Sequence, residues 1–138
     1  MIGIDSMTGD SPATTDNAME PHILVVDDEV VATMALERFL ERRGFRVTTA
    51  FDGRQALDAH ARDAADVVVT DMRMPRLGGR ELIQALRGPQ PELPVVVVTG
   101  FLSSDDEAAA LVGPHTAVMT KPLDPEALLR TLKGLLGR

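Results

Sequence analysis

Three short runs of consecutive apolar residues constrain the fold of this chain more than any other feature. They lie at residues 23–26, 67–69 and 95–98 and consist almost entirely of valine, with one isoleucine and one leucine. A strand with one face in water alternates apolar and polar residues, whereas a continuously apolar strand is covered on both faces, as in a parallel sheet. The sequence therefore predicts an α/β protein with a buried parallel sheet.

Helical patterns alternate with the candidate strands, which are His22–Val26, Arg46–Ala50, Val67–Thr70, Val95–Val98 and Ala117–Met119. A first helix has an apolar stripe from Val31 to Leu40 and is expected to end with Gly44 as its C′ residue. The next two helices are predicted over Gly53–Arg62, after Asp52, and over Gly79–Arg87. The predicted order of elements is β-α repeated five times.

Two more helices complete this pattern. Ser103 or Ser104 can cap a fourth helix with an acidic first turn, which Gly113-Pro114 ends. Asp124-Pro125 begins a fifth helix, because aspartate caps a helix and proline suits its first position. The apolar stripe of that helix consists of Leu128, Leu129, Leu132, Leu135 and Leu136.

Composition narrows the class of protein. The 138 residues contain 14 Lys and Arg against 21 Asp and Glu, a net charge of −7, with no Trp and no Tyr, so we expect no nucleic-acid binding. No apolar run approaches the roughly 20 residues that cross a bilayer, so we expect no membrane association and a cytoplasmic location. The absence of Cys excludes thiolate chemistry. We interpret residues 1–20 as a disordered arm and residues 21–138 as one domain.

Reactive side chains follow four of the five predicted strands. Asp27, Asp28 and Glu29 follow the first, Asp71 the third, Thr99 the fourth, and Lys121 with Pro122 the fifth. Taken singly, each is more often a capping, turn or surface residue. However, the carboxyl ends of parallel strands meet at one edge of the sheet, where such folds bind ligands. Their coincidence at one edge therefore predicts a functional site.

The residue types in this set suit phosphoryl chemistry. Carboxylates that lie together repel one another unless a cation intervenes, and oxygen ligands suit Mg²⁺, or Mn²⁺ in its place. A carboxylate can attack phosphorus to give an aspartyl phosphate, while the metal and a lysine neutralise charge on the transferred group. A threonine hydroxyl could donate a hydrogen bond to a phosphoryl oxygen.

These motifs resemble the receiver domains of two-component response regulators, including chemotaxis receivers. The resemblance covers residues 21–138 and rests on Asp27-Asp28, on D-M-R-M-P at 71–75 with Gly78-Gly79, on Thr99-Gly100 and on Lys121-Pro122. It implies a flavodoxin-like doubly wound sheet of strand order 2-1-3-4-5.

The same resemblance implies a role for each matched residue. Asp71 would be the phosphoacceptor, and Asp28, Asp71 and the backbone carbonyl of Arg73 would bind the metal, with Asp27 holding it through water. Lys121 would be the lysine of the family and Thr99 its switch hydroxyl. Pro122 would follow a cis peptide bond.

One departure concerns the switch. Many receivers place an aromatic residue three positions before the lysine, where this chain has Val118. Phe101, in a Thr-Gly-Phe stretch similar to that of some single-domain regulators, is a candidate replacement. Alternatively, Phe101 only fills a hydrophobic gap.

We expect a stand-alone receiver, a monomer or weak dimer, that takes its phosphoryl group from a sensor histidine kinase or a histidine phosphotransfer protein. It would act on a downstream protein through a face formed by the fourth helix, the strand Ala117–Met119 and the helix after Asp124. It would be a switch with at most self-catalysed phosphorylation and slow self-dephosphorylation.

A phosphatase of the haloacid dehalogenase type is a weaker alternative, because Arg73 stands where that family needs an acid. A flavin carrier is disfavoured because no Trp or Tyr could flank the ring.

Overall fold

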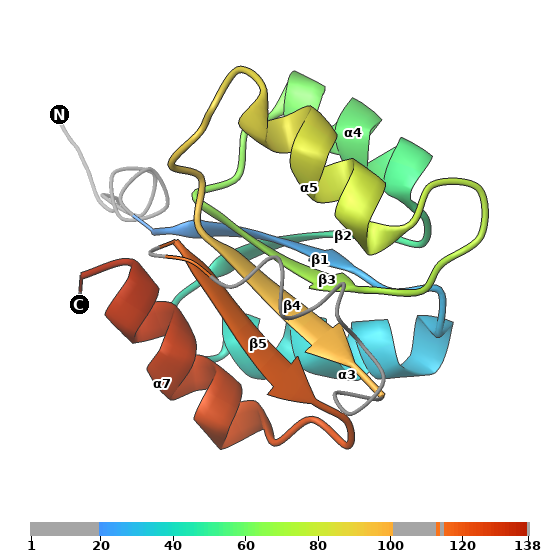
Figure 1. Ribbon diagram of the computed structural model, residues 1–138. Coiled ribbons are helices and arrows are strands. Elements are labelled where there is room, and N and C mark those ends of the chain that lie inside the picture. Colours follow the sequence, from blue (N-terminus) through green and yellow to red (C-terminus); the bar gives the residue numbers. More distant parts are fainter. Residues whose placement is uncertain (1–19, 101–112, 114, 138) are drawn as a thin grey trace, which may run out of the picture.

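The computed structural model describes residues 20–100, 113 and 115–137. This part of the chain contains five strands and four helices, and a described helix follows every strand except the fourth (Figure 1). In chain order, the elements are β1 (His22–Val26), α3 (Val30–Glu41), β2 (Arg46–Ala50), α4 (Gly53–Arg62), β3 (Val67–Asp71), α5 (Gly79–Arg87), β4 (Val95–Thr99), β5 (Thr116–Thr120) and α7 (Pro125–Leu135). The predicted fourth helix, Phe101 and most of the N-terminal arm lie outside the described residues.

All strand pairs are parallel, in the order β2-β1-β3-β4-β5. Helices α3 and α7 cover one face of the sheet, and α4 and α5 cover the other (Figure 1). The predicted flavodoxin-like fold is therefore confirmed.

The apolar strands are buried on both faces, as their sequence predicts. Leu24, Val26, Val68, Val95 and Val97 pack with the leucines and alanines of α4 and α5. Their neighbours in the strands pack on the opposite face with leucines of α3 and α7; these neighbours are Ile23, Val25, Val67, Val69, Val96 and Val98. The sheet is thus the centre of two cores.

Local signals at the helix ends match the structure closely. The Asp52 side chain accepts a hydrogen bond from the Gln55 N–H at 2.8 Å and caps α4. Asp124 caps α7 by accepting from the Glu126 N–H at 3.1 Å, with Pro125 in the first turn. Helix α3 ends earlier than predicted: Arg42 is its C-cap, and Gly44 takes the left-handed conformation (φ 90°) two residues further on.

The sequence is a poorer guide to the burial of α3. Only Thr33 and Leu40 of this helix are buried, while Val31, predicted on the apolar stripe, is 82% exposed. A cavity of about 340 Å³ also lies beneath the helix, lined by Leu36 and Phe39 on one side and by Leu123 on the other. Leu36 and Phe39 of the apolar stripe therefore border this open space, whereas Val31 is exposed to solvent.

Among the described residues, no helix is both long enough and apolar enough to cross a membrane.

Candidate functional site

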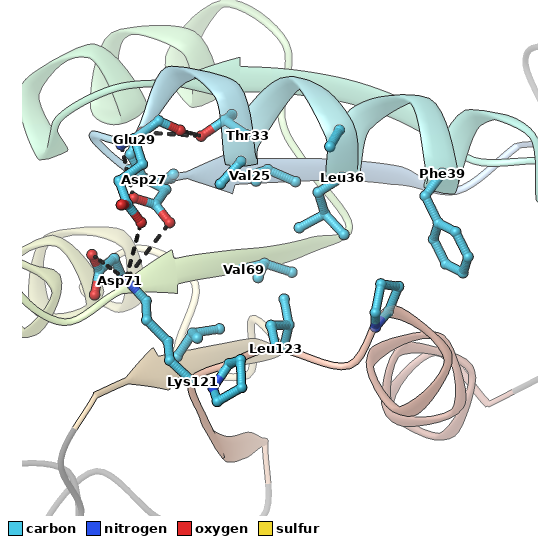
Figure 2. Close-up of a pocket in the computed structure, with 16 residues that line it drawn as sticks. Val25, Asp27, Glu29, Thr33, Leu36, Phe39, Val69, Asp71, Lys121 and Leu123 are labelled. Carbon is cyan, nitrogen blue, oxygen red and sulfur yellow. Dashed lines mark hydrogen bonds and ion pairs between the residues drawn. The ribbon is translucent and has the colours of Figure 1, made fainter.

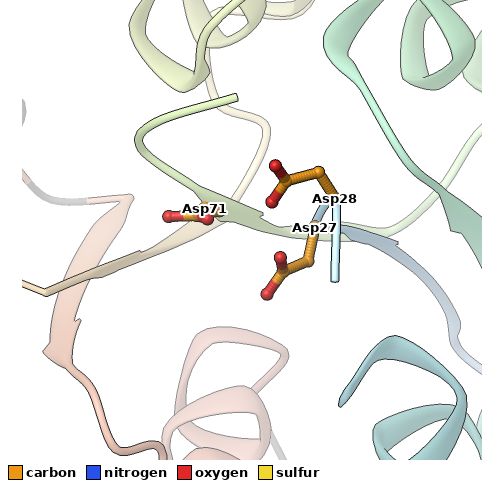
Figure 3. A group of neighbouring side chains, drawn as sticks. All are labelled: Asp27, Asp28 and Asp71. Atoms are coloured by element: carbon orange, nitrogen blue, oxygen red, sulfur yellow. The ribbon is translucent and has the colours of Figure 1, made fainter. Parts of the chain in front are cut away.

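Three carboxylates meet at the carboxyl edge of the sheet (Figure 3). Asp27 and Asp28 follow β1, and Asp71 is the last residue of β3, which pairs directly with β1. One oxygen from each carboxylate lies within 4.8 Å of the other two. Asp71 is buried, Asp27 is partly buried and Asp28 is exposed, so the cluster opens to solvent on one side.

Lys121 brings a positive charge to these carboxylates. Its ammonium group donates a hydrogen bond to Asp71 Oδ2 at 3.2 Å and lies 3.8 Å from Glu29 Oε1 and 3.9 Å from Asp27 Oδ2 (Figure 2). The Lys121 N–H also donates to the carbonyl of Thr99 at 2.9 Å, which ties the loop after β5 to the end of β4. The site thus joins β1, β3, β4 and the segment after β5.

Burial and the charges at this edge together shift two pKa values. The pKa of the Asp27 carboxyl is raised, mainly by burial and further by repulsion from Asp71 and Glu29. The hydrogen bond from the Glu29 N–H and the attraction of Lys121 lower it, but by less. Burial disfavours the charged form of Lys121, but the hydrogen bond to Asp71 and the attraction of Asp71, Asp27 and Glu29 outweigh it and raise the Lys121 pKa. Asp27 is therefore harder to ionise than an ordinary aspartate, and Lys121 is held in its charged form.

The loop after Asp71 is closely packed against the strand. The Arg73 N–H lies 3.4 Å from Asp71 Oδ1, and the Gly79 N–H donates to the Met72 carbonyl at 2.9 Å. A Cβ at Gly79 would stand only 2.5 Å from the Asp71 carbonyl oxygen, so glycine is required here. This close approach fixes the main chain around Asp71.

The other residues singled out from the sequence lie in or near this edge. Thr99 is buried at the end of β4, and the Lys121–Pro122 peptide bond is cis. Val118 is partly buried against the core on the α4 and α5 face. Phe101 lies outside the described residues.

Two features of the site were missed by sequence reasoning. In the sequence, Glu29 is only one member of an acidic run. In the structure it faces Lys121 across the site, a contact that sequence spacing does not indicate. The second feature is the cavity beneath α3, which reaches from Asp71 and Lys121 to Phe39 (Figure 2) and which no sequence pattern indicates.

The donor set fits a hard divalent cation. Carboxylate oxygens are the ligands that Mg²⁺ prefers, and it usually keeps several waters, which the exposed side of the cluster can admit. A cation would also relieve the repulsion that Asp71 and Glu29 exert on Asp27. We therefore treat the three aspartates as a candidate magnesium site.

Comparison with known proteins identifies the class. The model of the response regulator receiver domain matches residues 23–133. The chain therefore belongs to the response regulator receiver domains of two-component signalling.

Particular relatives fit this assignment. The chain is 40% identical over 120 residues to response regulator MprA of Mycolicibacterium vanbaalenii, a match that covers 87% of this chain and 52% of MprA. It is 37% identical over 118 residues to the transcriptional regulatory protein PrrA of Mycobacterium tuberculosis, a match that covers 86% of this chain and 51% of PrrA. The chain thus spans about half the length of these curated relatives.

Solved structures resemble the chain over nearly their whole length. Chemotaxis response regulator CheY4 of Vibrio cholerae superimposes with a TM-score of 0.76 at 30% identity, over 85% of this chain and 99% of CheY4. A response regulator receiver protein from Sinorhizobium medicae gives a TM-score of 0.77 at 29% identity, over 87% of this chain and 97% of that one.

Proposed function

We propose that this receiver accepts a phosphoryl group on Asp71 from a phosphohistidine of a sensor histidine kinase or a histidine phosphotransfer protein. A carboxylate oxygen of Asp71 attacks phosphorus, the bond from phosphorus to the histidine nitrogen breaks, and the imidazole leaves as that nitrogen takes up a proton. The observation that carries this proposal is the position of Asp71. It is a buried carboxylate at a strand end that accepts a hydrogen bond from Lys121 and lies next to the carboxylates of Asp27 and Asp28.

Each neighbouring group has a part in this step. Asp27, Asp28, Asp71 and the carbonyl of Arg73 would hold Mg²⁺, or Mn²⁺, which when bound neutralises charge on the transferred phosphoryl group. Lys121 already hydrogen-bonds Asp71 and can shift its ammonium group to a phosphoryl oxygen.

Thr99 would sense the product. It ends β4, and its carbonyl accepts from the Lys121 N–H, so its backbone is held beside the site. A hydrogen bond from its hydroxyl to the phosphoryl group would move the segment after Gly100. With Val118 in place of an aromatic residue, Phe101 is our candidate for transmitting that movement to the face that includes β5 and α7.

The surface beside Asp71 is suited to a protein donor. Val30, Val31 and Met34 are 49%, 82% and 45% exposed at the amino end of α3, directly after the acidic cluster. Exposed apolar residues next to a reactive group are typical of protein contact surfaces. A phosphatase of the haloacid dehalogenase type is not favoured, because Arg73, two residues beyond Asp71, cannot serve as its general acid.

Phosphorylation by a small donor tests the proposal. We expect acetyl phosphate with Mg²⁺ to add a single phosphoryl group, about 80 Da, to the intact protein. Asp71→Asn should abolish this addition, whereas Asp58→Asn, which removes an exposed carboxylate from α4, should leave it unchanged. Full modification of the Asp71→Asn protein would refute the assignment.

The metal requires a separate test. We expect Mg²⁺ alone to raise the melting temperature of the wild-type protein, because it relieves repulsion within the cluster. Asp28→Asn should remove most of this rise, with Asp58→Asn again as the control. An undiminished rise in Asp28→Asn would place the metal elsewhere.

A further inference from the structure

Asp52 is a buried carboxylate outside the three-aspartate cluster, and an arginine from a distant loop holds it. The side chain of Asp52 is only 3% exposed, whereas that of Arg76 is 71% exposed. Asp52 Oδ2 accepts from Arg76 Nε at 3.1 Å and from Nη2 at 2.7 Å, while Oδ1 caps α4. The chemistry proposed for Asp71 uses neither residue.

Arg76 adopts an unfavourable backbone conformation to make this pair. Its φ of 67° lies in the left-handed region, and it is the only residue other than glycine with positive φ in the described part of the chain. Side chains of L-residues disfavour this region. The turn at residue 76 could be made more easily by glycine, so what the arginine adds here is its side-chain bond to Asp52.

The loop that Arg76 belongs to is the loop beside the phosphoacceptor. Residues 72–78 connect Asp71 to α5 and include Arg73, whose carbonyl is our proposed metal ligand. The loop packs against the start of α4, where a Cβ at Gly53 would stand 2.4 Å from the Leu77 carbonyl oxygen. Asp52 directly precedes Gly53, so the ion pair anchors the loop at the point where it meets α4.

We propose that Asp52 and Arg76 are positioning residues that hold the loop 72–78 in place and thereby set the affinity of the site for Mg²⁺. The inference rests on the metal site of the proposed function. Two charge-assisted hydrogen bonds from one guanidinium group meet at Asp52 Oδ2, which makes this a strong anchor for the loop. Without the pair, the loop would lose this anchor, and Arg73, whose N–H lies 3.4 Å from Asp71 Oδ1, would be held less firmly beside the site.

Two variants separate positioning from folding. Arg76→Gly removes the pair but relieves the left-handed conformation. Asp52→Asn keeps an oxygen that can cap α4 and removes the charge that Arg76 binds. The matched control is Arg46→Ala, which removes another arginine from an exposed ion pair, with Asp63, at the amino end of β2.

The experiment is a calorimetric titration of each metal-free protein with MgCl₂, at a temperature where circular dichroism shows every variant folded. We expect both variants to bind Mg²⁺ about tenfold more weakly than wild type, the lower end of the range for residues that hold metal ligands in place. Arg46→Ala should bind as wild type does. Because the two residues act as one unit, the double variant Asp52→Asn with Arg76→Gly should lose no more affinity than either single variant.

The outcomes distinguish this inference from the proposed function. If wild type and both variants bind Mg²⁺ equally well, the positioning role is wrong while the metal site stands. Losses that add up in the double variant would also overturn it, since the residues would then act independently. If wild type binds no Mg²⁺ at all, the metal site of the proposed function fails and the positioning role fails with it.

Discussion

The substitution Lys121→Met tests how charge is balanced at the carboxyl edge of the sheet. Methionine retains an unbranched apolar side chain of similar length but has no ammonium group. Lys121 donates a hydrogen bond to Asp71 at 3.2 Å, and two further carboxylate oxygens lie within 3.9 Å of its Nζ. Its removal takes one positive charge from an edge that carries four carboxylates: those of Asp27, Asp28, Glu29 and Asp71.

The magnitude follows from the exposure of the two partners. A hydrogen bond to a charged group contributes about 1.5–3 kcal/mol to stability. The Asp71 side chain is 9% exposed but that of Lys121 is 33% exposed, so water screens the pair and the lower end, about 1.5 kcal/mol, applies. In a domain of this size, 1 kcal/mol corresponds to about 4 °C in melting temperature. The metal-free variant should therefore melt about 6 °C below wild type.

Magnesium should change this difference in a defined way. A bound divalent cation neutralises the same carboxylates, so saturating Mg²⁺ should bring the two melting temperatures together. By linkage, the variant should then bind Mg²⁺ more tightly than wild type. Differential scanning calorimetry with and without MgCl₂ measures both effects.

The chain provides its own control for this experiment. Its only other lysine is Lys133, an exposed residue in the last turn of α7, and Lys133→Met should change stability by no more than about 0.5 kcal/mol. Equal melting temperatures of Lys121→Met and wild type without Mg²⁺ would refute the reasoning. So would a difference that Mg²⁺ leaves unchanged.

Two further predictions concern the same edge of the sheet. Because the pKa of Asp27 is raised above 3.8, the folded state binds more protons than the unfolded state between that value and the raised pKa, and stability falls as pH rises through this interval. The substitution Asp27→Asn should remove that fall, so the metal-free variant should be more stable than metal-free wild type at neutral pH. A lower melting temperature of the variant in thermal unfolding would contradict this. Gly79→Ala should destabilise by about 1–3 kcal/mol, because its Cβ would meet backbone atoms of Asp71 and Met72. In contrast, Gly134→Ala in α7 meets no atom within 4 Å and should stabilise by about 0.5–1 kcal/mol; equal effects of the two alanines in urea unfolding would refute the steric argument.

Much of the fold could be predicted because its signals are local. The continuously apolar strands predict burial on both faces, and the capping residues Asp52 and Asp124 mark where two helices begin. The strands extend slightly beyond the apolar runs, so that Asp71 and Thr99 are the last residues of β3 and β4. Main-chain pairing carries the strands into these polar residues, an extension that hydrophobic patterning alone does not show.

Other features depend on contacts between distant segments, and the sequence does not predict them. The apolar stripe of α3 predicts a helix packed along its whole length, but a cavity lined by Leu36, Phe39 and Leu123 lies under it. The bond between Arg76 and Asp52 depends on a left-handed turn at an arginine, a residue type that does not signal positive φ. The approach of Glu29 to Lys121 likewise follows from three-dimensional structure alone.

The central claim is that Asp71, and no other carboxylate, carries the phosphoryl group. Borohydride reduces an acyl phosphate of aspartate to homoserine, so reduction after treatment with acetyl phosphate and Mg²⁺ marks the modified residue permanently. Peptide mass mapping should then find homoserine at position 71 alone, and only when Mg²⁺ was present. Homoserine at Asp27 or Asp28, or its absence from position 71, would contradict the account.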